Sequence, residues 1–351
     1  MLYRYPIFRN HISFRLNRNV IYFFCKLRYV DGNSSLNPLS NYFSNDFASF
    51  LATNKQTTLR NLFTVFFNVF KNLPENERKL IIKKFQDSQK ISLVIHDTTI
   101  DCHDYCLPSL PVPIRVSAKQ LFEYLFSATL NSYGKLKDHY KLIFDSIESN
   151  ICPFCGIELL NRPSIIRQDY DHLMKQSAYT FVTVNMENLV PTGVECNRIN
   201  KHNIDALYFN NLRSVFNSPY TNNFNIRISL LGSTPPTTID GNGNWIIGIL
   251  PDNDYTRQWE YVYNIRARYK DNILHKFYKN WLKELRTYLT NRNLVPVSSQ
   301  VLETELLAQS TTWIANPTTG LTNIVRGAFY EFLIQYNDPA YRASILNYIN
   351  N

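Results

Sequence analysis

The chain has 351 residues, of which 44% are hydrophobic and 19% charged, so it can form two or three domains and is not broadly disordered. Its net charge of +9 is concentrated: residues 1–30 hold six basic and no acidic residues, and residues 254–292 hold nine basic and four acidic ones. This uneven charge excludes a uniformly basic, histone-like protein. It predicts two cationic surfaces on an otherwise near-neutral body.

Cysteine usage and hydropathy indicate the cell compartment in which the protein is expected. No apolar run approaches the roughly 18 residues that a membrane-spanning helix needs, so we expect no membrane association. Six cysteines could form three disulfides, but the chain is long, shows no secretory signal and contains a Cys-x-x-Cys. This combination favours a cytoplasmic protein with metal-bound or free thiols. The basic start of the chain is expected to be a structured arm rather than a targeting peptide.

Apolar periodicity gives the elements of the first half. The residues that recur at helical spacing and predict helices within 41–87 are Leu59, Leu62, Phe63, Phe66, Phe67 and Phe70. The elements expected next, in chain order, are a candidate strand at 91–96, a Pro-rich joint at 108–114, helices at about 117–130 and 135–149, a change to short strand-like pieces at 151, and a polar helix near 196–210.

The second half is expected to be mostly helical after one hairpin. Residues 226–231 and 244–249 are predicted to pair across the Gly-Asn-Gly at 241–243, and helices follow from 255. The fold class is therefore α+β, with mostly helical flanking regions around a compact central domain. The expected domains are a basic arm and helical region at 1–115, a helical connection at 116–150, the central domain at 151–215, and a basic hairpin-plus-helical region at 216–351.

The stretch from Cys152 to His202 gathers the residues that can carry chemistry. Ile165–His172 is predicted to be a strand, on which Asp169 and Asp171 point to the same side. Two carboxylates on one face suit a hard divalent cation such as Mg²⁺. Beside them, His172 can act as a general base, because its unperturbed pKa is close to neutral.

Amides and cations complete this candidate site. Asn188 opens a second apolar run, and Asn197 follows nine residues later at an expected helix start, where its amide oxygen could complete a cation site. Three nearby cationic residues are candidates to contact phosphates: Lys175, Arg198 and Lys201.

In this order and at this spacing, these residues resemble the motif of HNH endonucleases, which have the ββα-metal fold. The resemblance covers about 55 residues and rests on Asp169-Tyr-Asp-His172, Ser177-x-Tyr179, Asn188-Leu-Val-Pro191 and Cys196-Asn-Arg198. It implies phosphodiester hydrolysis with His172 as the general base and with Asp171 and Asn197 as ligands of one Mg²⁺ or Mn²⁺ ion. It also implies that Asn188 orients the base through backbone hydrogen bonds. Asp169 would be a supporting carboxylate, or would only pair with a neighbouring Arg or Lys.

The family's cysteines are incomplete in this chain. Many HNH members carry two Cys-x-x-Cys pairs that bind a structural Zn²⁺. Here Cys152 and Cys155 form the first pair, but Gly193 replaces the first Cys of the second pair and only Cys196 is left. Two alternatives stay open: the three thiolates bind zinc with a fourth ligand, for which Asp101–Cys106 is a candidate, or the zinc is lost.

A second basic segment has helical order. On a helix over 273–289, one broad face is apolar: Leu274, Phe277, Tyr278, Trp281, Leu282, Leu285 and Tyr288. The opposite face is cationic: Lys276, Lys279, Lys283 and Arg286. This face is either the solvated side of a packed helix or a stripe that binds the phosphates of a nucleic acid.

The resemblance implies a metal-dependent endonuclease that nicks or cleaves DNA. Large flanks without a recognisable DNA-reading module resemble the effector nucleases of bacterial defence against phage, which often work with an ATPase or sensor subunit. One alternative is a catalytically degenerate HNH subunit that binds DNA or assembles a complex, which the broken cysteine pair motivates. Another is a restriction or homing-type endonuclease.

Overall fold

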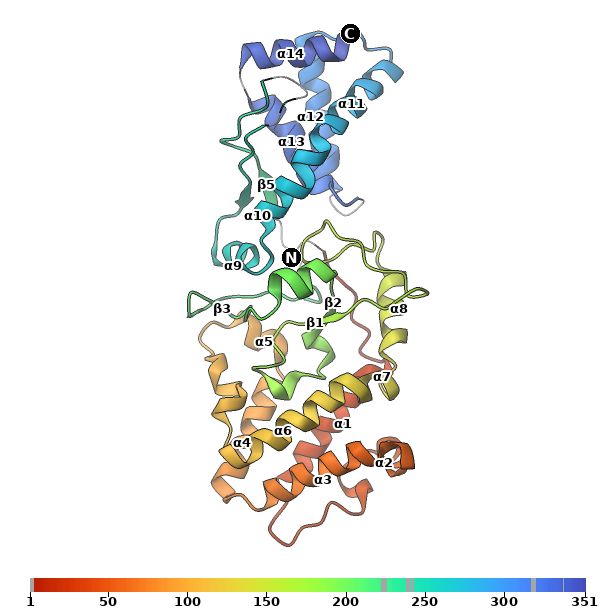
Figure 1. Cartoon of the computed structure of the whole chain (residues 1–351), viewed down its shortest axis with the longest axis vertical. Helices are drawn as coiled ribbons and strands as arrows, with labels where there is room; N and C mark the ends of the chain where they lie inside the picture. Colours follow the sequence, from red (N-terminus) through yellow and green to blue (C-terminus); the bar gives the residue numbers. More distant parts are fainter. Residues whose placement is uncertain (1–2, 222–225, 238–240, 242, 317–319, 337) are drawn as a thin grey trace. The chain divides into compact units, whose positions relative to one another are not determined.

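The computed structural model describes residues 3–221, 226–237, 241, 243–316, 320–336 and 338–351. Over these residues the chain is mostly helical, with short antiparallel strand pairs, in agreement with the expected α+β class. It forms two compact units (Figure 1). We call Arg4–Ile147 with Leu160–Asn222 the N-terminal unit. The C-terminal unit is Met1–Tyr3, Glu148–Leu159 and Asn223–Asn351.

This division has two units where four domains were expected, and the expected regions 1–115 and 116–150 fall almost entirely within the N-terminal unit. The boundary at 222/223 lies close to the expected one at 215/216. However, the segment Glu148–Leu159, which holds the Cys-x-x-Cys, is grouped with the C-terminal unit rather than with the rest of 151–215. Trp259 Nε1 donates to the Phe154 carbonyl and the Tyr269 hydroxyl donates to the Cys155 carbonyl, so helices far along the sequence hold this segment.

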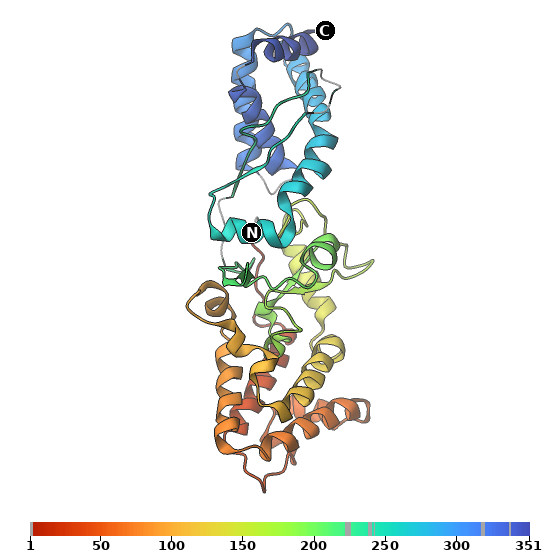
Figure 2. The ribbon, with the colours of Figure 1, turned by 60° about the vertical axis from the view of Figure 1, so that its left-hand side comes forward.

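Helices build most of the N-terminal unit (Figures 1 and 2). They are α1 (Ile12–Leu27), α2 (Asn45–Ala52), α3 (Thr57–Lys71), α4 (Glu75–Ser88), α5 (Ile91–His96), α6 (Val112–Tyr124), α7 (Leu130–Ser132) and α8 (Leu136–Ser146), with a π-helical turn η5 (Leu125–Thr129) joining α6 to α7. Of the apolar face predicted for α3, Leu62 is half-buried and the other five residues are fully buried, and α3 packs against α6. The predicted helices at 117–130 and 135–149 are confirmed as α6 to α8.

The candidate strand at 91–96 is wrong, because this segment forms helix α5. Ile91, Val94 and Ile95 are buried at positions i, i+3 and i+4, which is the spacing of one helix face. A short apolar run of this length does not distinguish a strand from a buried helix by sequence alone. The helical choice is supported by the hydrogen bond from the Val94 amide to the Lys90 carbonyl.

An aromatic core extends from the helices to a loop of the later sequence. The rings of Phe24 and Phe85 stack with centroids 3.7 Å apart. Phe181 packs on both and on Phe122, at centroid distances of 5.4 to 5.6 Å. Because Phe181 is fully buried, the loop that contains it is fixed to the helical core.

The C-terminal unit combines a hairpin with a helical layer. Strands β5 (Arg227–Ser229) and β6 (Gly248–Leu250) pair antiparallel, with Ile228 opposite Ile249, which confirms the predicted hairpin. Part of its expected turn, Gly-Asn-Gly 241–243, lies outside the described residues at position 242. The helices are α9 (Asp254–Tyr263), α10 (Ile265–Arg268), the π-helical η9 (Tyr269–Leu274), α11 (His275–Asn291), α12 (Ser299–Ala315), α13 (Asn323–Gln335) and α14 (Pro339–Asn350).

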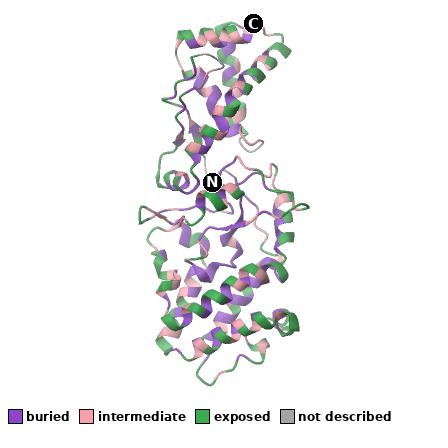
Figure 3. Ribbon diagram, in the orientation of Figure 1, coloured by how far each residue is buried: buried purple, intermediate pink, exposed green. Residues whose placement is uncertain are grey.

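Along these helices buried and exposed residues alternate in the ribbon (Figure 3). In α11 the buried face is Tyr278, Trp281, Leu282, Leu285 and Leu289. Phe277, expected on this face, is 36% exposed instead, because it lies at the edge of the apolar arc. Among the described residues, no helix has both the length and the apolar character needed to cross a membrane.

Candidate catalytic and metal site

Two short antiparallel strands followed by a helical turn position the candidate catalytic residues. Strand β1 (Tyr170–His172) pairs with β2 (Leu189–Pro191), so that Asp171 lies opposite Val190 and His172 opposite Leu189. The π-helical η8 (Glu195–Lys201) follows within a few residues. All three elements belong to the N-terminal unit.

These elements are shorter than expected. Only the last three residues of the predicted strand 165–172 pair with another strand, so Asp169 precedes β1 instead of sharing a strand face with Asp171. The polar helix expected near 196–210 ends at Lys201. Beyond it, β3 (Tyr208–Phe209) and β4 (Leu212–Arg213) pair through the two asparagines 210 and 211, whose positive φ angles form the turn.

Asn188 joins the two strands to the loop between them. Its side chain is completely buried and makes three hydrogen bonds to backbone groups, which use both of its N–H donors. Oδ1 accepts from the Met174 amide at 2.7 Å, and Nδ2 donates to the carbonyls of Met174 at 3.1 Å and Val182 at 3.2 Å. The Asn188 carbonyl also accepts from the Leu173 amide, so both ends of the loop are tied to one residue.

His172 is buried at the end of β1, and the loop held by Asn188 fixes its ring. Nε2 lies 3.0 Å from the carbonyl of Thr183, the residue after Val182. A carbonyl only accepts, so Nε2 carries the proton and Nδ1 keeps its lone pair in the neutral ring. Burial lowers the pKa of His172 to about 3, which keeps the imidazole neutral at physiological pH.

The Asp171 carboxylate is buried, and its two oxygens have different surroundings. Oδ1 accepts from Lys201 Nζ at 2.5 Å, and both side chains are only 4% exposed. Oδ2 is also buried but has no hydrogen-bond partner. Burial raises the pKa of the Asp171 carboxyl, and the Lys201 ammonium acts in the opposite direction. One oxygen of this carboxylate is therefore satisfied by a cation, and the other is left for a further ligand.

Asn197 lies four residues before Lys201 in η8 and is half-buried. Residues four apart on a helix are neighbours on one face, so Asn197 is on the side of η8 that holds Lys201 against Asp171. Asp169 has a different partner: Arg198 Nε donates to its Oδ2 at 2.9 Å in an exposed ion pair. Of the two roles expected for Asp169, the contacts in this structure are those of the ion pair with a basic neighbour.

The three cations expected to contact phosphates are placed differently from one another. Arg198 is 66% exposed while it pairs with Asp169. Lys175 donates from Nζ to the Asn203 carbonyl at 2.5 Å. Lys201 requires a correction: it is buried in ion contact with Asp171, so its ammonium is not available on the surface to bind a phosphate.

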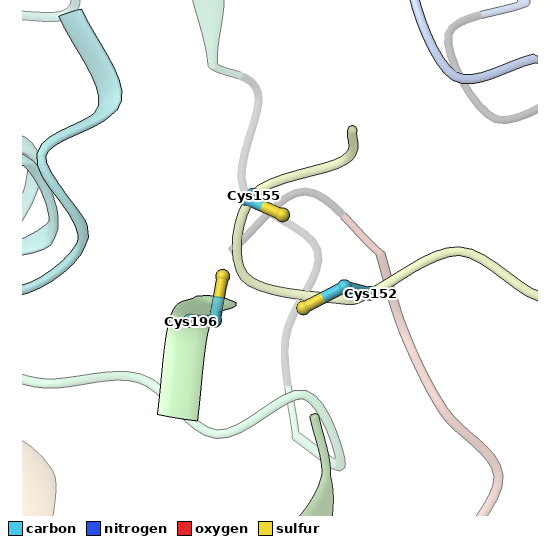
Figure 4. Close-up of side chains that lie close together, drawn as sticks. All are labelled: Cys152, Cys155 and Cys196. Carbon is cyan, nitrogen blue, oxygen red and sulfur yellow. The ribbon is translucent and has the colours of Figure 1, made fainter. Parts of the chain in front are cut away.

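The three expected thiol ligands come together. Cys152, Cys155 and Cys196 are buried, and their Sγ atoms all lie within 4.8 Å of one another (Figure 4). Burial and the neighbouring Cys155 and Cys152 raise the pKa of the Tyr3 phenol, which lies beside them. All six cysteines of the chain are free of disulfides. The cluster could hold a metal ion such as zinc.

The segment Asp101–Cys106 does not supply the fourth ligand. Within the described part of the chain, no His, Asp or Glu joins the three thiols in this group. Instead, Asp101 accepts from the hydroxyl of Tyr208 and from the His103 amide, and Cys102 is buried against the carbonyls of Val94 and Ile100. Burial raises the pKa of Cys102 to about 12, so it is a neutral, packed thiol.

The four cations of α11 share the face opposite its buried side chains. Lys276 and Lys283 are exposed, whereas Lys279 and Arg286 are half-buried. Lys279 lies 5.8 Å from the centroid of the Tyr278 ring and Arg286 lies 5.6 Å from that of Tyr348, so part of their surface packs on aromatic rings.

Sequence reasoning missed the Thr183 carbonyl and gave Lys201 a different role, that of a phosphate contact. The Thr183 carbonyl, which sets the His172 tautomer, carries no side-chain signal that a sequence could show. Lys201 did carry one, because its spacing of four from Asn197 predicts a shared helix face. Comparison of the chain with protein-family models, with curated proteins and with solved structures found no match.

Proposed function

We propose that the protein is a metal-dependent HNH-type endonuclease that hydrolyses phosphodiester bonds of DNA. The observation that carries this proposal is the arrangement around β1: a neutral, oriented histidine follows a buried aspartate with an unpartnered oxygen. Both precede a helix whose first turn contains Asn197. The motif resemblance and the contacts around β1, β2 and η8 support the same assignment of roles.

His172 would act as the general base. Its Nδ1 lone pair accepts a proton from water as the water oxygen forms a bond to phosphorus, and the bond from phosphorus to the leaving sugar oxygen breaks. The leaving oxygen takes its proton from solvent. Because the Thr183 carbonyl accepts a hydrogen bond from Nε2–H, the ring needs no tautomer change before Nδ1 accepts the proton. Asn188 would position this loop without touching the substrate.

Asp171 and Asn197 would supply the ligands of a hard divalent ion. Asp171 Oδ2 is a buried acceptor with no partner, and an unsatisfied buried oxygen is costly unless a cation or water binds it. Asn197 would add an amide oxygen, and oxygen ligands of this kind suit Mg²⁺ or Mn²⁺. When bound, the ion would polarise the phosphate and stabilise charge on the departing oxygen.

A plasmid-cleavage assay tests the nuclease proposal. With Mg²⁺ or Mn²⁺ the wild-type protein is expected to nick or cut DNA, and His172→Ala should reduce the rate by about 100-fold or more, as is usual when a general base is removed. His103→Ala is the matched control, because His103 is an exposed histidine of the same unit. Cleavage by His172→Ala at the wild-type rate would contradict the assignment of the base.

We also propose that Cys152, Cys155 and Cys196 bind a structural Zn²⁺, with one tetrahedral position left to another ligand. Purified protein is expected to contain one zinc per chain. Cys152→Ser should lose it, whereas Cys25→Ser, at a half-buried thiol outside the cluster, should keep it. Elemental analysis measures both. Wild-type protein purified without chelator and free of zinc would contradict the proposal and favour loss of the metal in this chain.

The biological setting proposed from the resemblance is an effector in bacterial defence against phage, acting in the cytoplasm with an ATPase or sensor subunit. The alternative from a different class is a catalytically degenerate subunit that binds DNA or assembles a complex. This alternative would be favoured if no DNA were cleaved, either by the protein alone or together with the product of a neighbouring gene. A restriction or homing-type enzyme would instead cut at one defined sequence.

A further inference from the structure

Lys201 is a buried cation inside the candidate metal site. Its Nζ lies 2.5 Å from Asp171 Oδ1 and 2.6 Å from the carbonyl oxygen of His172. The ammonium thus bridges the side chain of one candidate catalytic residue and the backbone of the next. Lys is rarely buried unless it is paired, and the desolvation cost of this pair is large.

A purely structural ion pair explains the environment of only one of the two carboxylate oxygens of Asp171. A salt bridge that served only stability would be expected to have both carboxylate oxygens satisfied. Here the ammonium satisfies Oδ1, while Oδ2 is buried and unpartnered. The carboxylate is therefore arranged with one oxygen for a resident cation and the other for a second ligand.

We propose that Lys201 is a positioning residue that acts as a built-in cation. It neutralises Asp171 and holds the end of β1 when the divalent ion is absent, and it weakens binding of that ion when it is present. This inference rests on the proposed function. Its physical basis is that two positive charges which share one buried carboxylate repel each other, while the negative charge of Asp171 alone would attract the metal more strongly.

The proposal makes opposite predictions for folding and for metal affinity. Replacing Lys201 by Met keeps most of the length of the side chain and removes its charge. In the absence of metal, Asp171 would then be buried without a partner, so the melting temperature should fall. Mn²⁺ should bind with a Kd lower than that of the wild-type protein by about tenfold or more. It should therefore raise the melting temperature of Lys201→Met by more than that of the wild type.

The experiment measures Mn²⁺ binding by titration calorimetry and melting temperature with and without Mn²⁺. It uses wild type, Lys201→Met, Lys201→Arg, Asp171→Asn and the double variant Lys201→Met/Asp171→Asn. Lys201→Arg keeps the charge and should keep a Kd near the wild-type value. The double variant should fold, because its pair is neutral, and should not bind Mn²⁺ at this site. Lys84→Met removes another largely buried lysine of the same unit and should leave the Kd unchanged.

The outcomes distinguish the proposed role of Lys201 from the proposed metal-dependent function. If Lys201→Met binds Mn²⁺ with the wild-type Kd, the role of Lys201 as a competing cation is overturned while the metal site stands. If wild type and Asp171→Asn show the same response to Mn²⁺, Asp171 is not a ligand and the proposed metal-dependent function fails with it. If Lys201→Met does not fold even with Mn²⁺, Lys201→Gln takes its place: a Kd about tenfold below the wild-type value supports the competition, and an unchanged or raised Kd overturns it.

Discussion

Asn188 shows how one side chain can hold a candidate active site together. Its three side-chain hydrogen bonds fix Met174 and Val182, and the next residue, Thr183, fixes the His172 ring. The sequence motif implied backbone hydrogen bonds from this residue but not which groups it would contact. Which carbonyls lie within reach depends on the path of the loop, and Phe181 in the aromatic core determines that path.

Asn188→Ala is expected to lower the free energy of unfolding by about 2 to 4 kcal/mol, because it leaves a buried amide and two buried carbonyls without their partner. Denaturant unfolding measures this change. Asn131→Ala, at an exposed asparagine of the same unit, should change stability by less than about 0.5 kcal/mol. Equal effects of the two substitutions would show that the loop is not held through Asn188.

At the level of elements, periodicity predicted long helices well and short segments poorly. The apolar faces of α3 and α11 follow from spacing alone, because a helix of four turns repeats its pattern several times. Residues 91–96 and 165–172 are segments of only six and eight residues, and their structures depend on neighbours: α5 is a helix, and only three residues of the expected strand pair with β2. Sequence patterns of this length are compatible with either structure.

Helix α11 carries the prediction for nucleic-acid binding. Lys276 and Lys283 are its exposed cations, so Lys276→Glu with Lys283→Glu should weaken DNA binding. The slope of log K against log salt should become shallower by about 2, because two phosphate contacts are lost. Lys119→Glu with Lys137→Glu changes the net charge equally at exposed positions of the other unit and should have a smaller effect. Equal effects would indicate that only the overall charge matters, and unchanged binding would restore the reading of α11 as a solvated face.

At the scale of the whole molecule, net charge and chemistry lie in different parts of the sequence. The stretch 151–205 holds five basic and six acidic residues, whereas the excess of positive charge is in 1–30 and 254–292. Within the first of these segments, Arg9 pairs with Glu187, while Arg15 and Arg18 are exposed on α1. Cationic side chains are thus available in both units for a polyanionic partner.

The sequence by itself determined the α+β class, the long helices, the hairpin of β5 and β6, and the identity of the candidate site residues. These features follow from local periodicity, turn residues and a motif with fixed spacing. Only the tertiary structure decided that Lys201 is buried on Asp171, that Asp169 pairs with Arg198, that Thr183 orients His172, and that three thiols meet without a residue from 101–106. Each of these contacts joins residues whose separation depends on how the intervening loops pack, and no local pattern specifies that packing.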